Sequence, residues 1–121
     1  MNLQPEQIKG FLIDIAGTLE FKGQAIPNTI NTVQALKAAK YSIKFLTNTD
    51  SKDPRKLLQI LTSLGFPITL DEVFTPIIAL RDFILSHPKD SFFLLTTQAV
   101  KNYLLDRSEE HTSELQSLLI I

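Results

Sequence analysis

The feature that most constrains this chain is an apolar run that ends abruptly in a carboxylate, Phe11-Leu12-Ile13-Asp14, with Gly17 and Thr18 shortly after it. Together with Ile8 and Gly10, the run predicts a strand buried on both faces, as in parallel α/β sheets. Ligands of open α/β sheets bind where the strands end. An Asp at that point is placed to act as a nucleophile or a metal ligand. The glycine permits a sharp turn, and the threonine offers a hydroxyl to an anion.

Helix and strand signals alternate along the rest of the chain, which predicts an α/β fold with a parallel sheet and flanking helices. Glycine and charged residues between Leu19 and Ile26 predict a short hairpin-like flap, and a helix should start at 27–29. Further strands are expected over 43–46, 72–75 and 92–95, and further helices over 54–64, 76–87 and 98–105.

A polar stretch, Thr47 to Ser51, follows the second predicted strand directly. Five hydroxyl, amide or carboxyl side chains in succession cannot all be core, so the stretch predicts a loop. If the connection from the first strand is the usual right-handed crossover, this loop lies at the same sheet edge as Asp14. Thr47 and Asn48 could cradle an anion there, or simply cap the next segment.

Composition narrows the class of protein. A length of 121 residues and 44% hydrophobic content suit one small domain with its own core, and a net charge of −1 gives no electrostatic reason to bind nucleic acid or an anionic membrane. The chain has no cysteine, which excludes disulfides, zinc-thiolate sites and thiol catalysis. No signal peptide or membrane-length apolar run is evident, so we expect a soluble, cytoplasmic protein.

These motifs, taken in order, resemble the haloacid dehalogenase (HAD) superfamily of hydrolases over about residues 8 to 106. The first HAD motif is an apolar strand ending in Asp-x-Asp-Gly-Thr, and the second Asp is replaced here by Ala16. The other matching segments are Ile26-Pro27, Phe45 to Thr49, Leu64 to Phe66 and Asp71 to Thr75.

The resemblance implies a HAD-like Rossmannoid three-layer sandwich with a parallel sheet, cut off before the cap domain and the later core strands. It implies a phosphatase in which Asp14 forms an aspartyl-phosphate intermediate. Mg²⁺ would be held by the Asp14 carboxylate and the backbone carbonyl of Ala16, and the phosphoryl group by Thr47 and Asn48. The substrate would be a small phosphorylated molecule or a phosphorylated side chain: a phosphate ester, a phosphoramidate or pyrophosphate.

Ala16 suggests a preference among such substrates. It has no titratable group and cannot protonate a leaving group. Protonation matters most for a poor leaving group such as an alkoxide, so we expect good leaving groups to be preferred.

The resemblance also implies parts that this chain lacks. A lysine and an acidic pair of the family motifs should lie beyond its end. Lys89 and Lys101 do not stand in the right sequence context to replace the lysine, and Asp71-Glu72 does not stand in the right context to replace the acidic pair. Mg²⁺ would be left with too few ligands, so we expect the 121-residue fragment to be essentially inactive. The Asp14 strand would become an exposed apolar edge, liable to aggregate or to pair with another chain, and a homodimer is compatible with this.

The C-terminal stretch 107–121 differs from the rest and resembles the translation of a widely used sequencing adapter. We therefore expect the HAD-like domain to cover 1–106 and the tail to be artefactual. The alternative is an amphipathic helix capped by Ser108, with Leu115, Leu118 and Leu119 on one face.

Two other functions compete with the phosphatase. One is a non-catalytic Rossmann-like binding or interaction module in which Asp14 is structural. The other is a phospho-accepting receiver-like domain, which would need an acidic pair at the first strand and a later strand-end lysine, and neither is evident in the sequence. His87 is interpreted as a helix C-terminal cap. Lys52, Arg55 and Lys56 are interpreted as a solvated helix start, with phosphate contact as the alternative.

Overall fold

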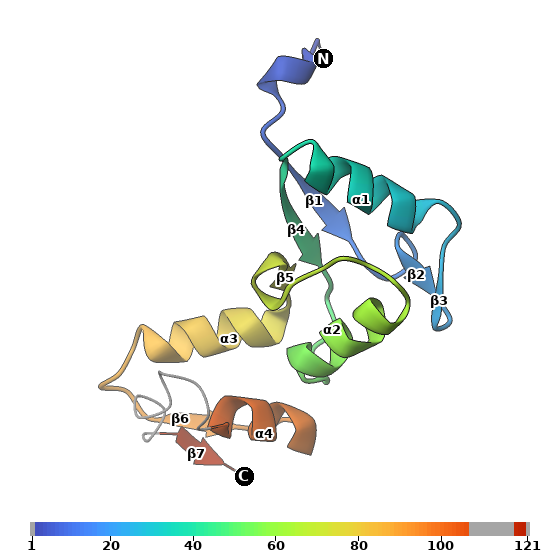
Figure 1. Cartoon of the computed structure of the whole chain (residues 1–121). Helices are drawn as coiled ribbons and strands as arrows, with labels where there is room; N and C mark the ends of the chain where they lie inside the picture. Colours follow the sequence, from blue (N-terminus) through green and yellow to red (C-terminus); the bar gives the residue numbers. More distant parts are fainter. Residues whose placement is uncertain (1, 107–117, 121) are drawn as a thin grey trace. The chain divides into compact units, whose positions relative to one another are not determined.

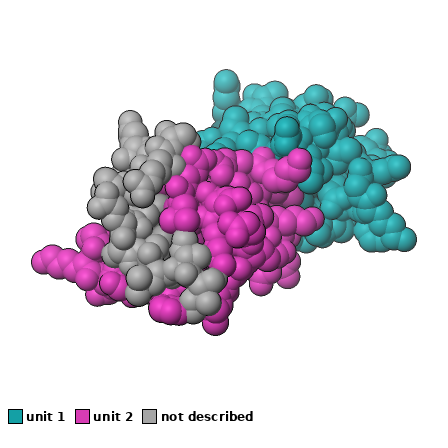
Figure 2. All heavy atoms as spheres, turned by 90° about the horizontal axis from the view of Figure 1, so that it is seen from below, with its two compact units in different colours: residues 1–47, 58–74 teal, residues 48–57, 75–121 magenta. Residues whose placement is uncertain are grey.

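The computed structural model describes residues 2–106 and 118–120 (Figure 1). The chain divides into two compact units, which Figure 2 shows in different colours. The first unit comprises residues 1–47 and 58–74, and the second comprises residues 48–57 and 75–121. We describe each unit by itself.

The first unit is built on a three-stranded sheet in the order β1-β4-β5. The strands are β1 (Gly10–Asp14), β4 (Ser42–Leu46) and β5 (Val73–Phe74), and all pairings are parallel (Figure 1). The register sets Gly10 beside Ser42 and Asp14 beside Leu46. The α/β fold with a parallel sheet is therefore confirmed.

The two faces of this sheet differ in burial. On β4, Ile43 and Phe45 are buried whereas Lys44 is exposed, so alternate side chains point to the core. Leu12 of β1 is in register with Lys44 and is 74% exposed. The prediction of a strand buried on both faces is therefore wrong, because β1 is an edge strand and the face it shares with Lys44 is open. The expected edge position of β1 is confirmed among the described residues.

The chain leaves β1 through the predicted hairpin, formed by β2 (Glu20–Phe21) and β3 (Gln24–Ala25). Lys22 and Gly23 between them have φ of 51° and 80°. Two successive positive φ values are the requirement of a type I′ turn, the connection that matches strand twist. The backbone N–H of Gly23 also donates to the Glu20 carboxylate (2.9 Å), which fixes the turn.

Helix α1 (Thr29–Ala38) lies alongside β1 and β4 and places Val33 in the core (Figure 1). Near its C-terminus, Lys37 donates to the Glu72 carboxylate (2.8 Å) and to the Pro67 carbonyl. Glu72 ends the short 3₁₀ helix η2 (Leu70–Glu72) and also accepts the backbone N–H of Thr69 (2.9 Å). Partial burial acts to raise the pKa of Glu72, but the hydrogen bonds from Lys37 and Thr69 outweigh it and hold that pKa below its ordinary value.

Helix α2 (Pro54–Ser63) follows the polar loop, close to the predicted 54–64. Its first residues belong to the second unit and its later residues to the first. The Asp53 carboxylate accepts the backbone N–H of Arg55 (2.8 Å) and so caps the start. Gly65, with φ of 105°, follows the end.

The second unit contains α3 (Pro76–Leu85), β6 (Phe92–Leu94), α4 (Gln98–Leu105) and β7 (Leu118–Ile120). Both helices begin at a threonine cap: the Thr75 hydroxyl accepts from Ile77 N (3.1 Å), and the Thr97 hydroxyl from Val100 N (3.3 Å). A cluster of buried hydrophobic side chains forms the core of this unit: Ile77, Ile84, Leu94, Val100, Tyr103 and Leu104. None of the described helices has the length and apolar character needed to cross a bilayer.

The pairing of β6 differs from the expected continuous sheet. β6 pairs in parallel with β7, in a two-stranded sheet of its own, rather than with the β1-β4-β5 sheet. Leu118–Ile120 is an apolar segment that can extend beside Phe92–Leu94, so the helical alternative for 118 and 119 is wrong. The tail residues 107–117, including Ser108 and Leu115, lie outside the described residues. The boundary at 106 stays a prediction.

The approach of β1 to β4 generates the first test. A Cβ added to Gly10 would lie 2.6 Å from the Ser42 carbonyl oxygen, closer than backbone atoms allow. We expect Gly10→Ala to lower the free energy of unfolding by about 1–3 kcal/mol, measured by urea denaturation. Lys9→Ala, one residue earlier and exposed, should change it by less than about 0.5 kcal/mol. An unchanged stability of Gly10→Ala would contradict the close approach.

The Lys37–Glu72 contact generates a pH test. Because the pKa of Glu72 is lowered in the folded state, its contribution is present above the unfolded-state pKa and is lost as the pH falls through the folded-state pKa. Between pH 6 and pH 3 the wild-type chain should therefore lose more stability than Glu72→Gln, by about 1 kcal/mol. Urea midpoints at each pH measure the difference, with Glu6→Gln on the exposed N-terminal segment as the control. Parallel pH profiles for wild type and Glu72→Gln would refute the contact.

Candidate functional site

Asp14 is the last residue of β1 and is exposed at the carboxyl end of the strand. The next residue, Ile15, is 2% exposed, and its N–H donates to the Leu46 carbonyl (2.9 Å), so the β1–β4 pairing continues past Asp14. The carboxylate therefore stands at the end of a well-anchored strand and outside the core.

The loop after Asp14 is organised by one carbonyl. The oxygen of Ile15 accepts the backbone N–H groups of Thr18 (3.2 Å), Leu19 (2.8 Å) and Glu20 (3.3 Å). Gly17 makes the turn with φ of 79°, a conformation that favours glycine. The exposed Ala16 sits within this turn and forms an isolated bridge with Glu20. Backbone groups hold the loop, and the methyl group of residue 16 contributes no titratable chemistry.

Thr47 comes directly after β4 and is 9% exposed. Its N–H donates to the Phe74 carbonyl at the end of β5 (3.2 Å), which holds the residue at the sheet edge. Because Asp14 is in register with Leu46, Thr47 follows the residue that faces Asp14. The first unit thus brings Asp14, Ala16 and Thr47 to the ends of two paired strands.

Asn48, the other predicted phosphate ligand, is exposed and begins the second unit, so it is not placed within the unit that holds Asp14. The polar stretch it belongs to has no helix or strand, as predicted. The Thr97 hydroxyl donates to the Ser51 carbonyl (2.9 Å), which ties this loop to the start of α4.

Arg55 differs from its predicted place on a solvated helix start. Its side chain is 34% exposed, and its Nη2 lies 2.7 Å from the Asp53 carboxylate while Nη1 donates to Asp106. The guanidinium also lies over the Tyr103 ring, 5.1 Å from the centroid. The hydrogen bond to Asp53 raises the pKa of Arg55, against an opposing effect of burial and with further help from Asp106. Arg55 is a structural ion-pair centre, whereas Lys52 and Lys56 are exposed as predicted.

His87 lies just beyond α3, and its Nδ1 is 2.8 Å from the Phe83 carbonyl. The Ser86 hydroxyl donates to the same carbonyl (2.7 Å), and Ser86 is the C-terminal cap residue of α3, so His87 lies at the helix end and its own capping role stays a prediction. Its ring also lies 4.3 Å from that of Phe83, between centroids.

Metal-ligating side chains are sparse. Within residues 2–106 and 118–120, no group of three or more His, Cys, Asp or Glu residues is arranged to hold a metal ion. Of the three residues at the strand ends, Asp14, Ala16 and Thr47, only Asp14 could offer a carboxylate to a metal ion.

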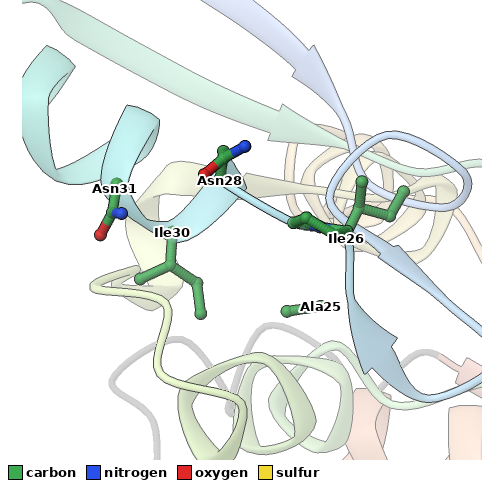
Figure 3. A pocket seen from close by; sticks show the side chains of 6 residues that line it. Ala25, Ile26, Asn28, Ile30 and Asn31 are labelled. Atoms are coloured by element: carbon green, nitrogen blue, oxygen red, sulfur yellow. The ribbon is translucent and has the colours of Figure 1, made fainter.

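A cavity of about 250 Å³ lies where β3 leads into α1 (Figure 3). It is lined by Ala25, Ile26, Pro27, Asn28, Ile30 and Asn31. Neither Asp14 nor Thr47 contributes to it, so the cavity is separate from the strand-end site.

Comparison with known proteins places these features in a family. The family model described as "Haloacid dehalogenase-like hydrolase" matches residues 11–108. This chain belongs to the haloacid dehalogenase-like hydrolase family. The predicted resemblance is confirmed.

Two named proteins of known sequence are similar to this chain. The chain is 31% identical to rat haloacid dehalogenase-like hydrolase domain-containing protein 2 over 96 residues, which are 79% of this chain and 37% of that protein. It is 36% identical over 73 residues to rat phospholysine phosphohistidine inorganic pyrophosphate phosphatase, which is 57% of this chain and 27% of that protein.

A solved structure shares the fold. The p-nitrophenyl phosphatase from Archaeoglobus fulgidus superposes with a TM-score of 0.73 and 26% identity, over 93% of this chain and 40% of that chain. The matched region therefore spans between 27% and 40% of the length of each of these relatives.

Proposed function

We propose that this chain is the N-terminal part of a phosphatase core in which Asp14 is the nucleophile. The observation that supports the proposal is the register of β1 and β4: the exposed Asp14 ends β1 beside Leu46, and Thr47 is the next residue of the chain after Leu46. Parallel α/β sheets bind ligands at this edge. The named phosphatase relatives favour a phosphoryl group as the ligand.

The chemistry runs in two displacements. An oxygen of the Asp14 carboxylate attacks phosphorus, and the bond from phosphorus to the leaving group breaks with its electron pair going to the leaving group. Water then attacks the aspartyl-phosphate, releasing inorganic phosphate and restoring the carboxylate. Thr47 would donate its hydroxyl to a phosphoryl oxygen, and Asn48, the next residue, would be the second phosphate ligand.

A magnesium ion would offset the repulsion between the carboxylate and the phosphate. Asp14 would supply a carboxylate oxygen and Ala16 its backbone carbonyl, with water and substrate oxygens as the other ligands. Mg²⁺ commonly binds through one or two carboxylates together with a substrate phosphate, so the donor types fit. Their number is small, because the described residues hold no larger ligand cluster. We therefore propose that the 121 residues alone are essentially inactive, and that a lysine and an acidic pair from further sequence complete the site.

The side chain of Ala16 shapes the substrate class. With no acid at this position, the leaving group departs without a proton from the loop. Aryl phosphates, phosphoramidates and pyrophosphate release stable leaving groups, whereas an alkyl ester releases an alkoxide. The small phosphorylated substrate, or phosphorylated side chain, should therefore belong to the first group.

Ala16 also favours a second candidate, a non-catalytic binding module that keeps the strand-end geometry after losing the chemistry. The sequence that follows codon 106 discriminates the two. A downstream strand-end lysine and an Asp-Asp pair support the enzyme, and their absence supports the binding module.

The nucleophile is tested in the chain extended by that following sequence. Asp14→Asn should lower the rate of aryl phosphate hydrolysis by about a thousandfold or more, because an amide is a poor nucleophile. It should also abolish the covalent phosphate adduct seen by mass spectrometry. Asp50→Asn, which changes an exposed carboxylate of the polar loop, is the matched control and should keep full activity. An Asp14→Asn variant that retains turnover would refute the assignment.

The role of Ala16 is tested by substrate choice in the same extended chain. We expect kcat/KM for an aryl phosphate to exceed that for an alkyl phosphate by about a hundredfold, the range that general acid catalysis supplies. Ala16→Asp restores an acid and should narrow the gap by raising the alkyl rate. Equal rates on the two substrates in the unaltered protein would contradict the proposed preference for good leaving groups.

A further inference from the structure

The polar loop that follows β4 is bonded to the start of α4. Asn48, the proposed phosphate ligand, opens this loop, and Ser51 follows a few residues later in the same unit. The Thr97 hydroxyl donates to the Ser51 carbonyl (2.9 Å). The same hydroxyl accepts the backbone N–H of Val100 (3.3 Å) and so caps the start of α4. One side chain therefore joins the loop to the helix.

A second contact holds the end of the loop where α2 begins. Asp106, the residue that follows α4, accepts from Nη1 of Arg55, and Nη2 of Arg55 lies 2.7 Å from the Asp53 carboxylate. These residues all belong to the second unit. The residues at both ends of α4 thus contact the segment 51–55, Thr97 at Ser51 and Asp106 at Arg55.

Packing fixes α4 itself. Its side chains Val100, Tyr103 and Leu104 are buried and belong to the cluster that also contains Ile77 and Ile84 of α3. A displacement of α4 would break this close packing and expose apolar surface to water. The loop is therefore bonded to an element that has little freedom to move.

We propose that Thr97 is a positioning residue for the phosphate site: by holding Ser51, it keeps the loop in the conformation from which Asn48 binds the phosphoryl group. The inference rests on the proposed function, which makes Asn48 a phosphate ligand. The side chains of Asn48 and Ser51 are exposed, so burial does not fix them. A loop without the bond to Thr97 would lose more conformational freedom when phosphate binds, and this entropic cost weakens binding.

The alternative is that Thr97 serves only as a helix cap. The two roles need different chemistry, because the cap accepts a hydrogen bond and the contact with Ser51 donates one. An ionised aspartate at this position would accept from Val100 but has no hydrogen to donate to Ser51. Aspartate is also among the preferred residues at a helix N-cap. Thr97→Asp therefore keeps the cap and removes the loop contact, Thr97→Ser keeps both, and Thr97→Ala removes both.

The affinity for inorganic phosphate, measured by calorimetry with Mg²⁺ present, tests the role of Thr97 in the chain extended beyond residue 106. Thr97→Asp and Thr97→Ala should each weaken it by about three- to tenfold, the effect of losing one hydrogen bond, whereas Thr97→Ser should match wild type. In aryl phosphate hydrolysis the two weakened variants should raise KM with little change in kcat, because Thr97 acts through the loop and not on the reacting atoms. Urea denaturation should show that Thr97→Asp is as stable as wild type and that Thr97→Ala is destabilised. A role confined to the helix cap would leave the phosphate affinity of Thr97→Asp unchanged.

Gln98→Glu is the matched control for the added charge. It places a carboxylate beside Thr97 but leaves the Thr97 hydroxyl intact, so its phosphate affinity should match wild type. Equal affinities for wild type and Thr97→Asp, or an equal loss in Gln98→Glu, would overturn the inference. An extended chain whose phosphate affinity depends on Thr97 but whose hydrolysis does not depend on Asp14 would refute the nucleophile and leave the role of Thr97 standing. An extended chain that binds no phosphate would overturn both.

Discussion

The parallel pairing of β1 with β4 is the interaction on which the first unit depends. Gly10 lets the two backbones approach at one end, and the Ile15 N–H closes the pairing at the other. Between them the register fixes Asp14 beside Leu46, and therefore close to Thr47. A shift of one residue would put a different residue of β4 beside Asp14 and change its distance along the sheet edge from Thr47. The site is thus a property of strand register more than of any side-chain contact.

Most elements could be predicted from the sequence because their signals are local. Apolar spacing located α2, α3 and α4 to within a few residues, proline marked the starts of α2 and α3, and Gly23 indicated the hairpin. The exposure of Leu12 could not be predicted, because an apolar run does not say whether a second face is covered. The separate pairing of β6 with β7 was missed for a similar reason, since a strand signal carries no information about its partner.

Some features of the candidate site could likewise be predicted from the sequence, and others could not. The positions of Asp14 and Thr47 at strand ends follow from where two apolar runs stop, so they could be predicted. The three hydrogen bonds that the Ile15 carbonyl accepts could not be predicted, because they depend on the φ of Gly17 and on the path of the loop. Nor could the place of Arg55, whose partner Asp106 lies 51 residues away and has no local signature. Contacts of this kind arise only when distant segments fold together.

The pairing of Arg55 with Asp106 also bears on the order in which the chain folds during synthesis. The β1-β4-β5 sheet has all its strands once residue 74 has emerged from the ribosome. At that point Asp53 has emerged with Arg55, but Tyr103 and Asp106 have not yet left the ribosome and cannot contact Arg55. Because synthesis runs from the N-terminus, the sheet of the first unit can form before the second unit is complete. The contacts of Arg55 at the start of α2 form only after α4 and Asp106 have emerged.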